Sequence, residues 1–251
     1  VRRVTLTGHS AEDWTAQVGV EIPRVKRLPL RVRLAYLLNR IPRRSNDSRL
    51  GILLDLEWIF GRLCHEASYA TFSNSEHPSR RATRDLLLRV FPAGARVLDV
   101  GCGSGDLLAT LSEVSAEVVG VDHSAEQIEF ARRLLDEAEM RNVRVLVEDG
   151  VEYLHRAGAQ VDVVVLSHIL EHLEDPSAVL RDVAALCAFV YVEVPDFESL
   201  ASNEFRRLLG RPLMFTDLDH VREFDRWELS GLVEGAGLTV LETDHRLGGA
   251  D

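Results

Sequence analysis

From residue 79 onward the sequence alternates between helical segments and short runs rich in valine, and this alternation constrains the fold more than any other feature. Valine-rich runs separated by helices are typical of a parallel sheet that is covered on both faces. We therefore predict an α/β fold with a doubly wound, mostly parallel sheet. The predicted strands are Ala95 to Val100, Glu117 to Val121, Val143 to Val147, Val161 to Ser167, Ala188 to Val194 and Leu238 to Thr243. The predicted helices lie near residues 80–91, 104–113, 125–139, 176–187 and 226–236.

The first 78 residues lack this alternation and predict a helical cap ahead of a domain at residues 79–251. Apolar residues recur there at helical spacing with arginines between them, which predicts an amphipathic basic helix. They are Leu30, Leu34, Leu37, Leu38 and Ile41. Asp47 or Ser48 is expected to cap a second helix that carries apolar residues from Ile52 to Leu63. A basic amphipathic helix either binds an anionic membrane or packs on a globular domain, and we favour packing.

Charge is divided unevenly along the chain. Residues 1–50 hold eleven basic and four acidic side chains, a formal charge of +7, whereas the remainder carries −18. This difference favours docking of residues 1–80 over the site, and the acidic domain argues against nucleic acid as a partner because a nucleic-acid backbone needs a basic face. Of the 29 basic residues only Lys26 is a lysine, a bias that is typical of bacterial genes rich in G and C.

Several classes of protein are disfavoured by what the sequence lacks. No stretch approaches the about 18 apolar residues of a membrane span, and the first twenty residues do not resemble a signal peptide. The three cysteines, Cys64, Cys102 and Cys187, are scattered and odd in number, which argues against a disulfide scaffold and a paired-cysteine zinc site. We expect no membrane attachment, no metal and a cytoplasmic location.

The first predicted strand runs directly into a glycine loop, with the sequence VLDVGCGSG at residues 97–105. Alternating glycines allow positive φ angles and close approach of the backbone to a ligand. A dinucleotide fingerprint would place its third glycine where this chain has Asp106. A carboxylate at the start of the following helix would repel a pyrophosphate. The loop therefore disfavours a dinucleotide and permits a ligand that brings a cation.

Polar residues end the next two predicted strands. Asp122 follows the second strand, where a carboxylate accepts hydrogen bonds from both hydroxyls of a ribose. Ser124 is expected to cap the next helix, with Gln127 completing a capping box. Asp149 and Gly150 follow the third strand, and Asp149 is placed to accept the exocyclic amine of an adenine. The spacing predicts a nucleoside cofactor at the carboxyl ends of the strands.

Together, the loop and the acids at strand ends one, two and three resemble class I S-adenosylmethionine-dependent methyltransferases. Two later segments, VDVVVLSHILEHLEDP from Val161 and EFDRWELSGLVEGAGL from Glu223, resemble that family's fourth strand with its turn and its late helix. The resemblance covers about residues 79–245. It implies a Rossmann-like methyltransferase fold, S-adenosyl-L-methionine as the cofactor and S-adenosyl-L-homocysteine as the product.

The resemblance also implies contacts between individual residues and the parts of the cofactor. They are Gly101, Gly103 and Gly105 for the methionine part, Asp122 for the ribose, and His123, Asp149 and the Gly150 amide for the adenine. The expected cofactor set is completed by Asp99, Cys102 and Ser167. Cys102 is expected to be a small filler and not a nucleophile, because nothing near it in the sequence would lower the pKa of its thiol.

The sequence departs from the family pattern at its end. After the sixth predicted strand only eight residues remain, too few for a turn and the antiparallel seventh strand that normally completes this sheet. Either that strand is absent, or the N-terminal segment replaces it, or the chain shown is shortened. An open sheet edge favours association, so a homodimer is left open.

Three histidines are candidates for a general base, which is useful when an acceptor hydroxyl must lose its proton. His168 and His172 follow the fourth strand, and His220, the first choice, lies in a long connection at 196–224 that is expected to form a lid. The alternative for each is a hydrogen-bonded structural role. Residues 168–172 also match the inverted zinc-protease motif H-x-x-E-H. Its first histidine would end a strand and not lie on a helix, so zinc hydrolysis is disfavoured.

Tyr69, Phe72 and His77 precede the core in a segment that such enzymes often fold over the methionine end of the cofactor. We expect them at the substrate pocket or lid, with packing under the cap as the alternative. The predicted function is methyl transfer to a hydroxyl of a small molecule, in natural-product or sugar metabolism. The alternatives are methylation of nitrogen or carbon, a non-catalytic cofactor-binding protein, and a nicotinamide-dependent oxidoreductase, against which Asp106 counts.

Overall fold

The computed structural model describes residues 29–39, 45–72, 76–157, 160–195, 197 and 201–244. The chain divides into two compact units, residues 1–49 and residues 50–251. The boundary predicted at residue 78 falls inside the second unit. This is because helix α3 (Asn46–Thr71) makes side-chain contacts with residues 206–217 of that unit.

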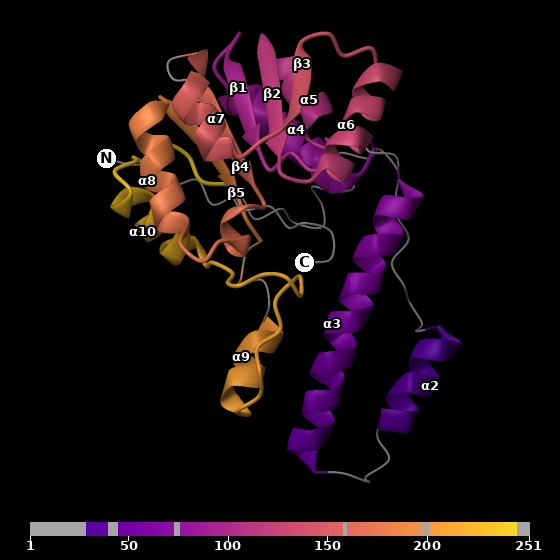
Figure 1. Ribbon diagram of the computed structural model, residues 1–251. Coiled ribbons are helices and arrows are strands. Elements are labelled where there is room, and N and C mark those ends of the chain that lie inside the picture. The colour runs from indigo at the N-terminus through magenta and orange to yellow at the C-terminus, as the bar shows by residue number, and fades with distance from the viewer. Residues whose placement is uncertain are drawn as a thin grey trace. The chain divides into compact units, whose positions relative to one another are not determined.

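The second unit contains a parallel sheet with the strand order β3-β2-β1-β4-β5 (Figure 1). The strands are β1 (Arg96–Val100), β2 (Glu117–Asp122), β3 (Val143–Val147), β4 (Val163–Ser167) and β5 (Phe189–Glu193). Each lies within two residues of a predicted strand. Val97 of β1 is opposite Val118 of β2 and Val163 of β4, so the valine runs form the centre of the sheet.

Helices cover both faces of this sheet, which confirms the predicted doubly wound α/β fold (Figure 1). They are α4 (Pro78–Val90), α5 (Leu108–Val114), α6 (Ala125–Glu137), α7 (Gly150–Ala157), α8 (Pro176–Leu186) and α10 (Arg226–Gly235). The sequence analysis predicts neither α7 nor the helix α9 (Ala201–Leu208) that follows β5. It also starts α5 near residue 104, which is wrong because residues 101–105 form a glycine turn ahead of the helix.

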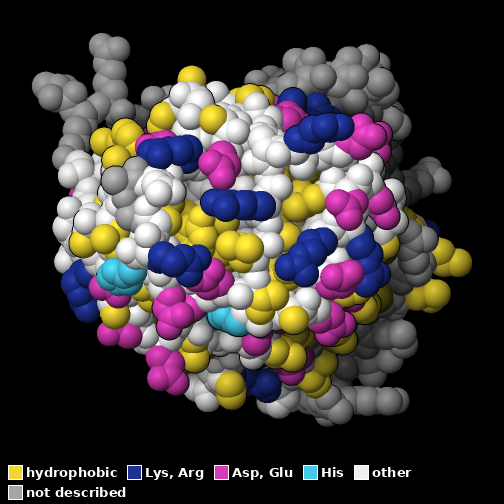
Figure 2. Space-filling model, turned by 45° about the horizontal axis from the view of Figure 1, so that its top comes forward, with side chains coloured by type: hydrophobic (Ala, Val, Ile, Leu, Met, Phe, Trp, Pro, Cys, Tyr) yellow, Lys and Arg dark blue, Asp and Glu magenta, His cyan; other side chains and the backbone are white. Residues whose placement is uncertain are grey.

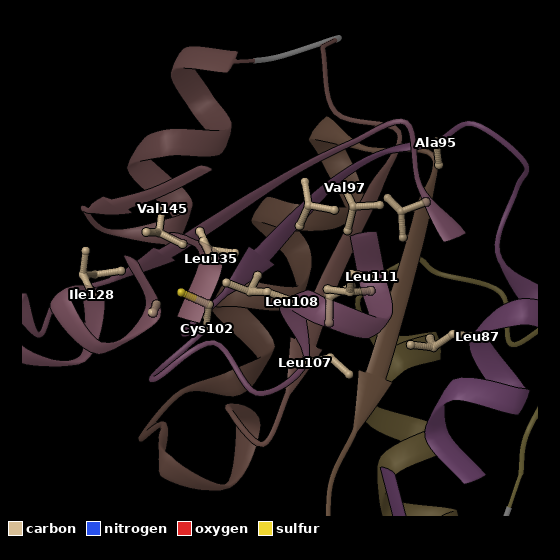
Figure 3. Close-up of a cluster of buried hydrophobic side chains, with 14 residues drawn as sticks. Leu87, Ala95, Val97, Cys102, Leu107, Leu108, Leu111, Ile128, Leu135 and Val145 are labelled. Atoms are coloured by element: carbon tan, nitrogen blue, oxygen red, sulfur yellow. The ribbon is translucent and has the colours of Figure 1, made fainter. Parts of the chain in front are cut away.

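Two apolar layers pack the helices onto the sheet. Leu87 of α4 and Ile128 of α6 are fully buried in the layer that holds Val97 of β1 (Figure 3). Leu154 of α7 is fully buried in the other layer, with Leu98 of β1. Neighbouring residues of a strand point to opposite faces, which is why Val97 and Leu98 join different layers. Full burial of such side chains stabilises the fold by about 1.5–3 kcal/mol each.

The prediction of a sixth strand at Leu238 to Thr243 is wrong. These residues follow α10 without pairing to any strand in the described part of the chain. Leu238 packs against the apolar layer that contains α10, whereas Leu241 is 79% exposed. The backbone of this segment therefore adds no strand to the described sheet. Among the described strands β5 is an edge of the sheet.

The helix α3 begins earlier than the sequence predicts. Ser45, and neither Asp47 nor Ser48, supplies the cap, since its hydroxyl accepts a hydrogen bond from the Ser48 amide at 3.3 Å. Later in the helix, the Trp58 indole donates to the Phe215 carbonyl at 2.7 Å. Residues 50–71 are thereby fastened to the predicted lid connection.

The helix α2 (Leu30–Asn39) occupies the position of the predicted basic helix. Its residues Leu30, Leu34 and Leu37 are exposed, whereas the Leu38 side chain and Ile41 lie outside the described residues. None of the helices in the described ranges is both long and apolar enough to cross a membrane.

Candidate functional site

The glycine loop is the turn that carries the chain from β1 to α5. Gly101, Gly103 and Gly105 have φ angles of 68°, 52° and 90°, a left-handed conformation that side chains with a Cβ rarely adopt. The amides of Gly101 and Cys102 both donate to the Val121 carbonyl, at 2.8 and 3.0 Å. The loop is therefore held against the end of β2. A Cβ on Gly103 would meet no atom within 4 Å, whereas a Cβ on Gly101 would lie 2.1 Å from the Ile169 side chain, so of these two glycines only Gly103 leaves its backbone uncovered.

Asp122 ties this loop to the beginning of α6. One of its carboxylate oxygens accepts from the Gly103 amide at 3.0 Å and the other from the Ser124 amide at 2.8 Å. Ser124 in turn accepts from the Gln127 amide, so Ser124 caps α6 as predicted. The predicted capping box is wrong, because the Ser124 amide donates to Asp122 and not to the Gln127 side chain. His123, between Asp122 and Ser124, is exposed. The structure thus places Asp122 and His123 beside the glycine loop, as the sequence predicts.

Asp149 and Gly150 lie where β3 passes into α7. The Asp149 carboxylate caps this unpredicted helix, because one oxygen accepts from the amides of Val151 and Glu152, both at 2.9 Å. Gly150 is buried, and a Cβ on it would lie 2.4 Å from the nearest side-chain atom of Val100. The glycine therefore permits α7 to pack closely on β1, and one oxygen of Asp149 remains available to a ligand.

Asp99 of β1 is the most strongly perturbed carboxyl group of the site. Its side chain is 2% exposed, and its Oδ2 atom has no hydrogen-bond partner. Burial and the nearby charge of Asp122 raise the pKa of Asp99 to about 7, against the opposing effect of Arg80. Burial also raises the pKa of the Cys102 thiol, as do the charges of Asp99 and Asp122. A raised pKa keeps the Cys102 thiol protonated, which agrees with a small packing residue and not with a nucleophile.

Arg80 is a residue of the site that the sequence analysis does not single out. Its guanidinium lies 3.0 Å from a carboxylate oxygen of Asp106, next to the glycine loop. Its charge also lowers the pKa of Asp99 and acts on His168. An arginine early in α4 thereby reaches the carboxyl ends of β1 and β4. The available signal was an Arg-rich helix directly before the first strand.

The three predicted lid residues gather where α3 ends and α4 begins. Tyr69 stacks on His77 with ring centroids 4.0 Å apart, and Phe72 meets the same imidazole edge-on at 6.2 Å. His77 is 2% exposed and bonds to Ser68 and Ser79 through its two nitrogens. Burial, with the charges of His65 and Arg80, lowers the pKa of His77. The Arg80 guanidinium lies 5.8 Å from the centre of the Tyr69 ring. The three side chains therefore pack on one another, and their place at the substrate pocket or lid stays a prediction.

The carboxyl end of β4 carries the predicted cofactor residue Ser167 and the first candidate base. Ser167 donates to Glu193 of β5 at 3.3 Å, and this glutamate also accepts from the Tyr191 hydroxyl. His168 has a φ angle of 56°, a conformation that costs about 1–2 kcal/mol in a residue with a Cβ. The acid at the end of the valine-rich strand β5 was the signal for Glu193, which the sequence analysis does not use.

The structure brings His172 and His220 together, although 48 positions separate them in the sequence. Their rings meet edge-on with centroids 4.8 Å apart. The Nδ1 atom of His220 lies 2.9 Å from a carboxylate oxygen of Glu223, and both side chains are almost fully buried. Sequence reasoning missed Glu223 because a glutamate before a helix ordinarily faces solvent.

His168 is held by a second buried glutamate. Its Nδ1 atom lies 3.2 Å from Glu171, whose side chain is fully buried. Burial lowers the pKa of His168, but the hydrogen bond to Glu171 and the charges of Glu193 and Glu171 outweigh it, so the pKa lies above its ordinary value. All three predicted histidines therefore lie in one histidine and carboxylate cluster, with Glu171 and Glu223 as its buried acids.

Two residues near opposite ends of the predicted lid connection, residues 196–224, are neighbours in the structure. The Phe197 amide donates to the Phe224 carbonyl at 3.1 Å. Between them, the side chain of Asn203 in α9 exchanges two hydrogen bonds with the backbone of Met214. Arg62 of α3 bonds to Asp217 of the same segment at 2.6 Å. The connection is thus a closed loop with its own internal contacts.

Residues 75–243 match the family described as Methyltransferase domain, which is more than half of the chain. The chain belongs to the S-adenosylmethionine-dependent methyltransferase family. Over 98 residues this methyltransferase is 36% identical to the ubiquinone biosynthesis O-methyltransferase of Xanthomonas axonopodis pv. citri, with 39% of the chain and 41% of that protein covered. Over 94 residues it is 39% identical to the protein of the same name from Proteus mirabilis, with 37% and 38% covered. It therefore spans about two fifths of the length of these curated relatives.

A solved structure with a similar fold is the magnesium protoporphyrin IX methyltransferase (ChlM) from Synechocystis PCC 6803 with bound SAH. The TM-score is 0.49 at 20% sequence identity, and the match covers 62% of this methyltransferase and 70% of that chain. On the face of the methyltransferase shown in Figure 2, basic and acidic side chains are intermixed and apolar side chains lie between them. The basic side chains of this face form no continuous stripe of the kind that grips a nucleic-acid backbone.

Proposed function

We propose that the protein transfers the methyl group of S-adenosylmethionine to a hydroxyl group of a small molecule. The observation that carries the cofactor part is the hydrogen bond between Asp122 and Gly103, which sets a carboxylate beside the uncovered backbone of Gly103 at the carboxyl ends of β1 and β2. A doubly wound sheet binds its ligand at these ends. An oxygen acceptor is supported by the printed names of the two curated relatives, which are O-methyltransferases.

The parts of the cofactor are assigned to residues on the same edge of the sheet. Asp122 accepts hydrogen bonds from the ribose, while His123, Asp149 and the Gly150 amide hold the adenine. The methionine part lies over the glycine loop. Arg80 is the cation for its carboxylate, because its guanidinium already pairs with a carboxylate beside that loop.

The acceptor side of the site is assigned to the histidine and carboxylate cluster. Methyl transfer from a sulfonium is an in-line displacement, so the protein must align the acceptor oxygen and, for a hydroxyl, remove a proton. His220 is the first candidate for this base because Glu223 fixes its ring through Nδ1. His168 and His172 are the second candidates. A natural product or a sugar as acceptor, and a cytoplasmic location, complete the proposal; methylation of nitrogen or carbon is the alternative.

Calorimetric titration tests the cofactor part. The protein is expected to bind S-adenosylmethionine and S-adenosylhomocysteine with micromolar or tighter affinity and not to bind NAD. Arg80→Gln should weaken S-adenosylhomocysteine binding by about 10-fold or more, the effect of losing a charge-assisted hydrogen bond. Arg84→Gln is the matched control, since Arg84 lies on the same helix and pairs with Glu113. Binding of NAD without a response to either adenosyl ligand would contradict the proposal.

A comparison of three variants tests the base. Mass spectrometry of hydroxyl compounds incubated with S-adenosylmethionine first identifies an acceptor. Under saturating cofactor, His220→Ala should then slow methyl transfer by about 10²- to 10⁴-fold, and His168→Ala or His172→Ala by less. Losses below about tenfold in all three would show that the enzyme works by alignment alone or methylates a nitrogen or carbon.

A further inference from the structure

We propose that Glu171, His172 and His220 form a binding site for one divalent cation of the zinc class. Each offers one ligand atom, and the three atoms lie within 4.8 Å of one another. No metal is expected from the sequence, because the cysteines are scattered and the first histidine of the H-x-x-E-H motif would end a strand. The structure retains Glu171 and His172 from that motif, places His168 outside the set, and supplies the third ligand from a distant segment.

The two segments that carry the ligands are joined through their backbones. The amides of Val221 and Arg222 both donate to the Glu171 carbonyl, at 3.0 and 3.3 Å. These bonds place His220 next to the short 3-10 turn that contains Glu171 and His172. The backbones of the two ligand segments are therefore joined without a bound ion, which reduces the entropic cost of binding one.

Neither buried acid pairs with a lysine or an arginine in the part of the chain that the structure describes. The side chains of Glu171 and Glu223 are both fully buried, and the Oε2 atom of each has no hydrogen-bond partner. The ion pairs of these two glutamates are made to imidazole rings. A buried carboxylate is costly unless it is paired with a cation or coordinates a metal. A divalent cation bound to Glu171 would supply this charge.

Each of the two histidines has a carboxylate behind its Nδ1 atom. The distances are 2.9 Å from His220 to Glu223 and 3.5 Å from His172 to Asp219. The Thr216 hydroxyl donates to the same oxygen of Glu223 at 2.6 Å and helps to orient that carboxylate. Histidines that bind metals almost always donate their second ring N–H to a carboxylate, a carbonyl or water. His220 makes this hydrogen bond through Nδ1, so the nitrogen that remains there for a cation is Nε2.

The ligand types select the class of ion. Imidazole nitrogens suit zinc and its neighbours among the transition metals, whereas magnesium and calcium prefer oxygen. Two histidines and one glutamate are a known ligand set of catalytic zinc sites, with one position left open. At Zn–N distances of about 2.0–2.1 Å the donors must move closer together than they are without the ion. The His172 side chain is 36% exposed, which gives the ion access from solvent.

Metal binding is measured on protein without an affinity tag, after treatment with a chelator, by titrating Zn²⁺ against a competing chromophoric chelator. The parent is expected to bind one equivalent, and a large excess of Mg²⁺ should not displace it. His172→Ala and Glu171→Gln should each weaken Zn²⁺ binding by at least about 10-fold. His155→Ala is the matched control, because His155 is an exposed histidine of α7. Absence of stoichiometric binding by the parent, or equal binding by all four proteins, would overturn the proposal.

A thermal measurement guards against unfolded variants. Saturating Zn²⁺ should raise the melting temperature of the parent and of His155→Ala, and should not raise that of His172→Ala, whose half-exposed position allows folding. The cation site goes beyond the proposed function and is tested separately from it. A cation on Nε2 of His220 would occupy the lone pair that a base needs, so the base role proposed for His220 applies to the cation-free protein. Binding of S-adenosylhomocysteine without Zn²⁺ binding would reject the cation site alone. Binding of Zn²⁺ without either adenosyl ligand would reject the proposed cofactor alone.

Discussion

When the pH is raised from 4 to 8, the deprotonation of Asp99 is expected to lower the free energy of unfolding of the cofactor-free protein by about 4 kcal/mol. The pKa of this carboxyl is raised from 3.8 to about 7 by burial and by Asp122. Between these two values the folded protein keeps a proton that the unfolded chain has lost. The stability that depends on this proton is therefore complete below pH 4, decreases as the pH rises, and is gone above pH 7.

Urea denaturation of the parent and of Asp99→Asn isolates this effect, since asparagine is neutral at every pH and has nearly the same shape. From pH 5 to pH 8 the parent should lose about 3 kcal/mol relative to the variant. The ionisable groups that do not interact with Asp99 are common to both proteins and cancel in the difference. A difference that stays constant over this range would mean that the Asp99 carboxyl is solvated and titrates normally.

Asp122→Ala is expected to weaken the binding of S-adenosylhomocysteine by about 1.5–3 kcal/mol, or roughly 10- to 150-fold. The substitution removes the acceptor proposed for the ribose. It also removes the two amide bonds that hold Gly103 and Ser124 in place. Both losses act in the same direction on the dissociation constant, which calorimetry measures.

Asp136→Ala is the control for this experiment, because Asp136 is an exposed acid at the end of α6. Its S-adenosylhomocysteine affinity should equal that of the parent. The Asp122 variant should remain folded, as circular dichroism can verify, because its side chain contributes to neither of the two apolar layers. A folded Asp122→Ala protein with the affinity of the parent would show that the ribose is held elsewhere.

The five strands were predictable from their valine-rich composition, and each of them finds a partner strand in the folded sheet. Leu238 to Thr243 has similar residues, yet no strand pairs with it among the described residues. Pairing is a property of the fold and is not encoded in the segment alone. Helix α7 was missed for a related reason. The sequence interprets Asp149 as a ligand-binding residue only, whereas in the structure this side chain also caps the helix.

The candidate site was predictable where a polar residue directly follows a strand, as Asp122 follows β2. It was not predictable where two segments must meet. The pairing of Arg80 with Asp106 and the contact of His172 with His220 depend on distances that only the folded chain defines. Glu171 and Glu223 were missed because charged residues are rarely buried fully, and sequence alone does not identify the exceptions.

The hydrogen bond between Phe197 and Phe224 has a consequence for how this protein can diversify. It makes the intervening residues a loop whose two ends are neighbours. Inserting or exchanging residues inside such a loop changes the entropic cost of closing it only slightly. The strand ends proposed to hold the cofactor lie outside this loop. Sequence changes within this loop can therefore alter which acceptor binds, while the residues that bind the methyl donor stay the same.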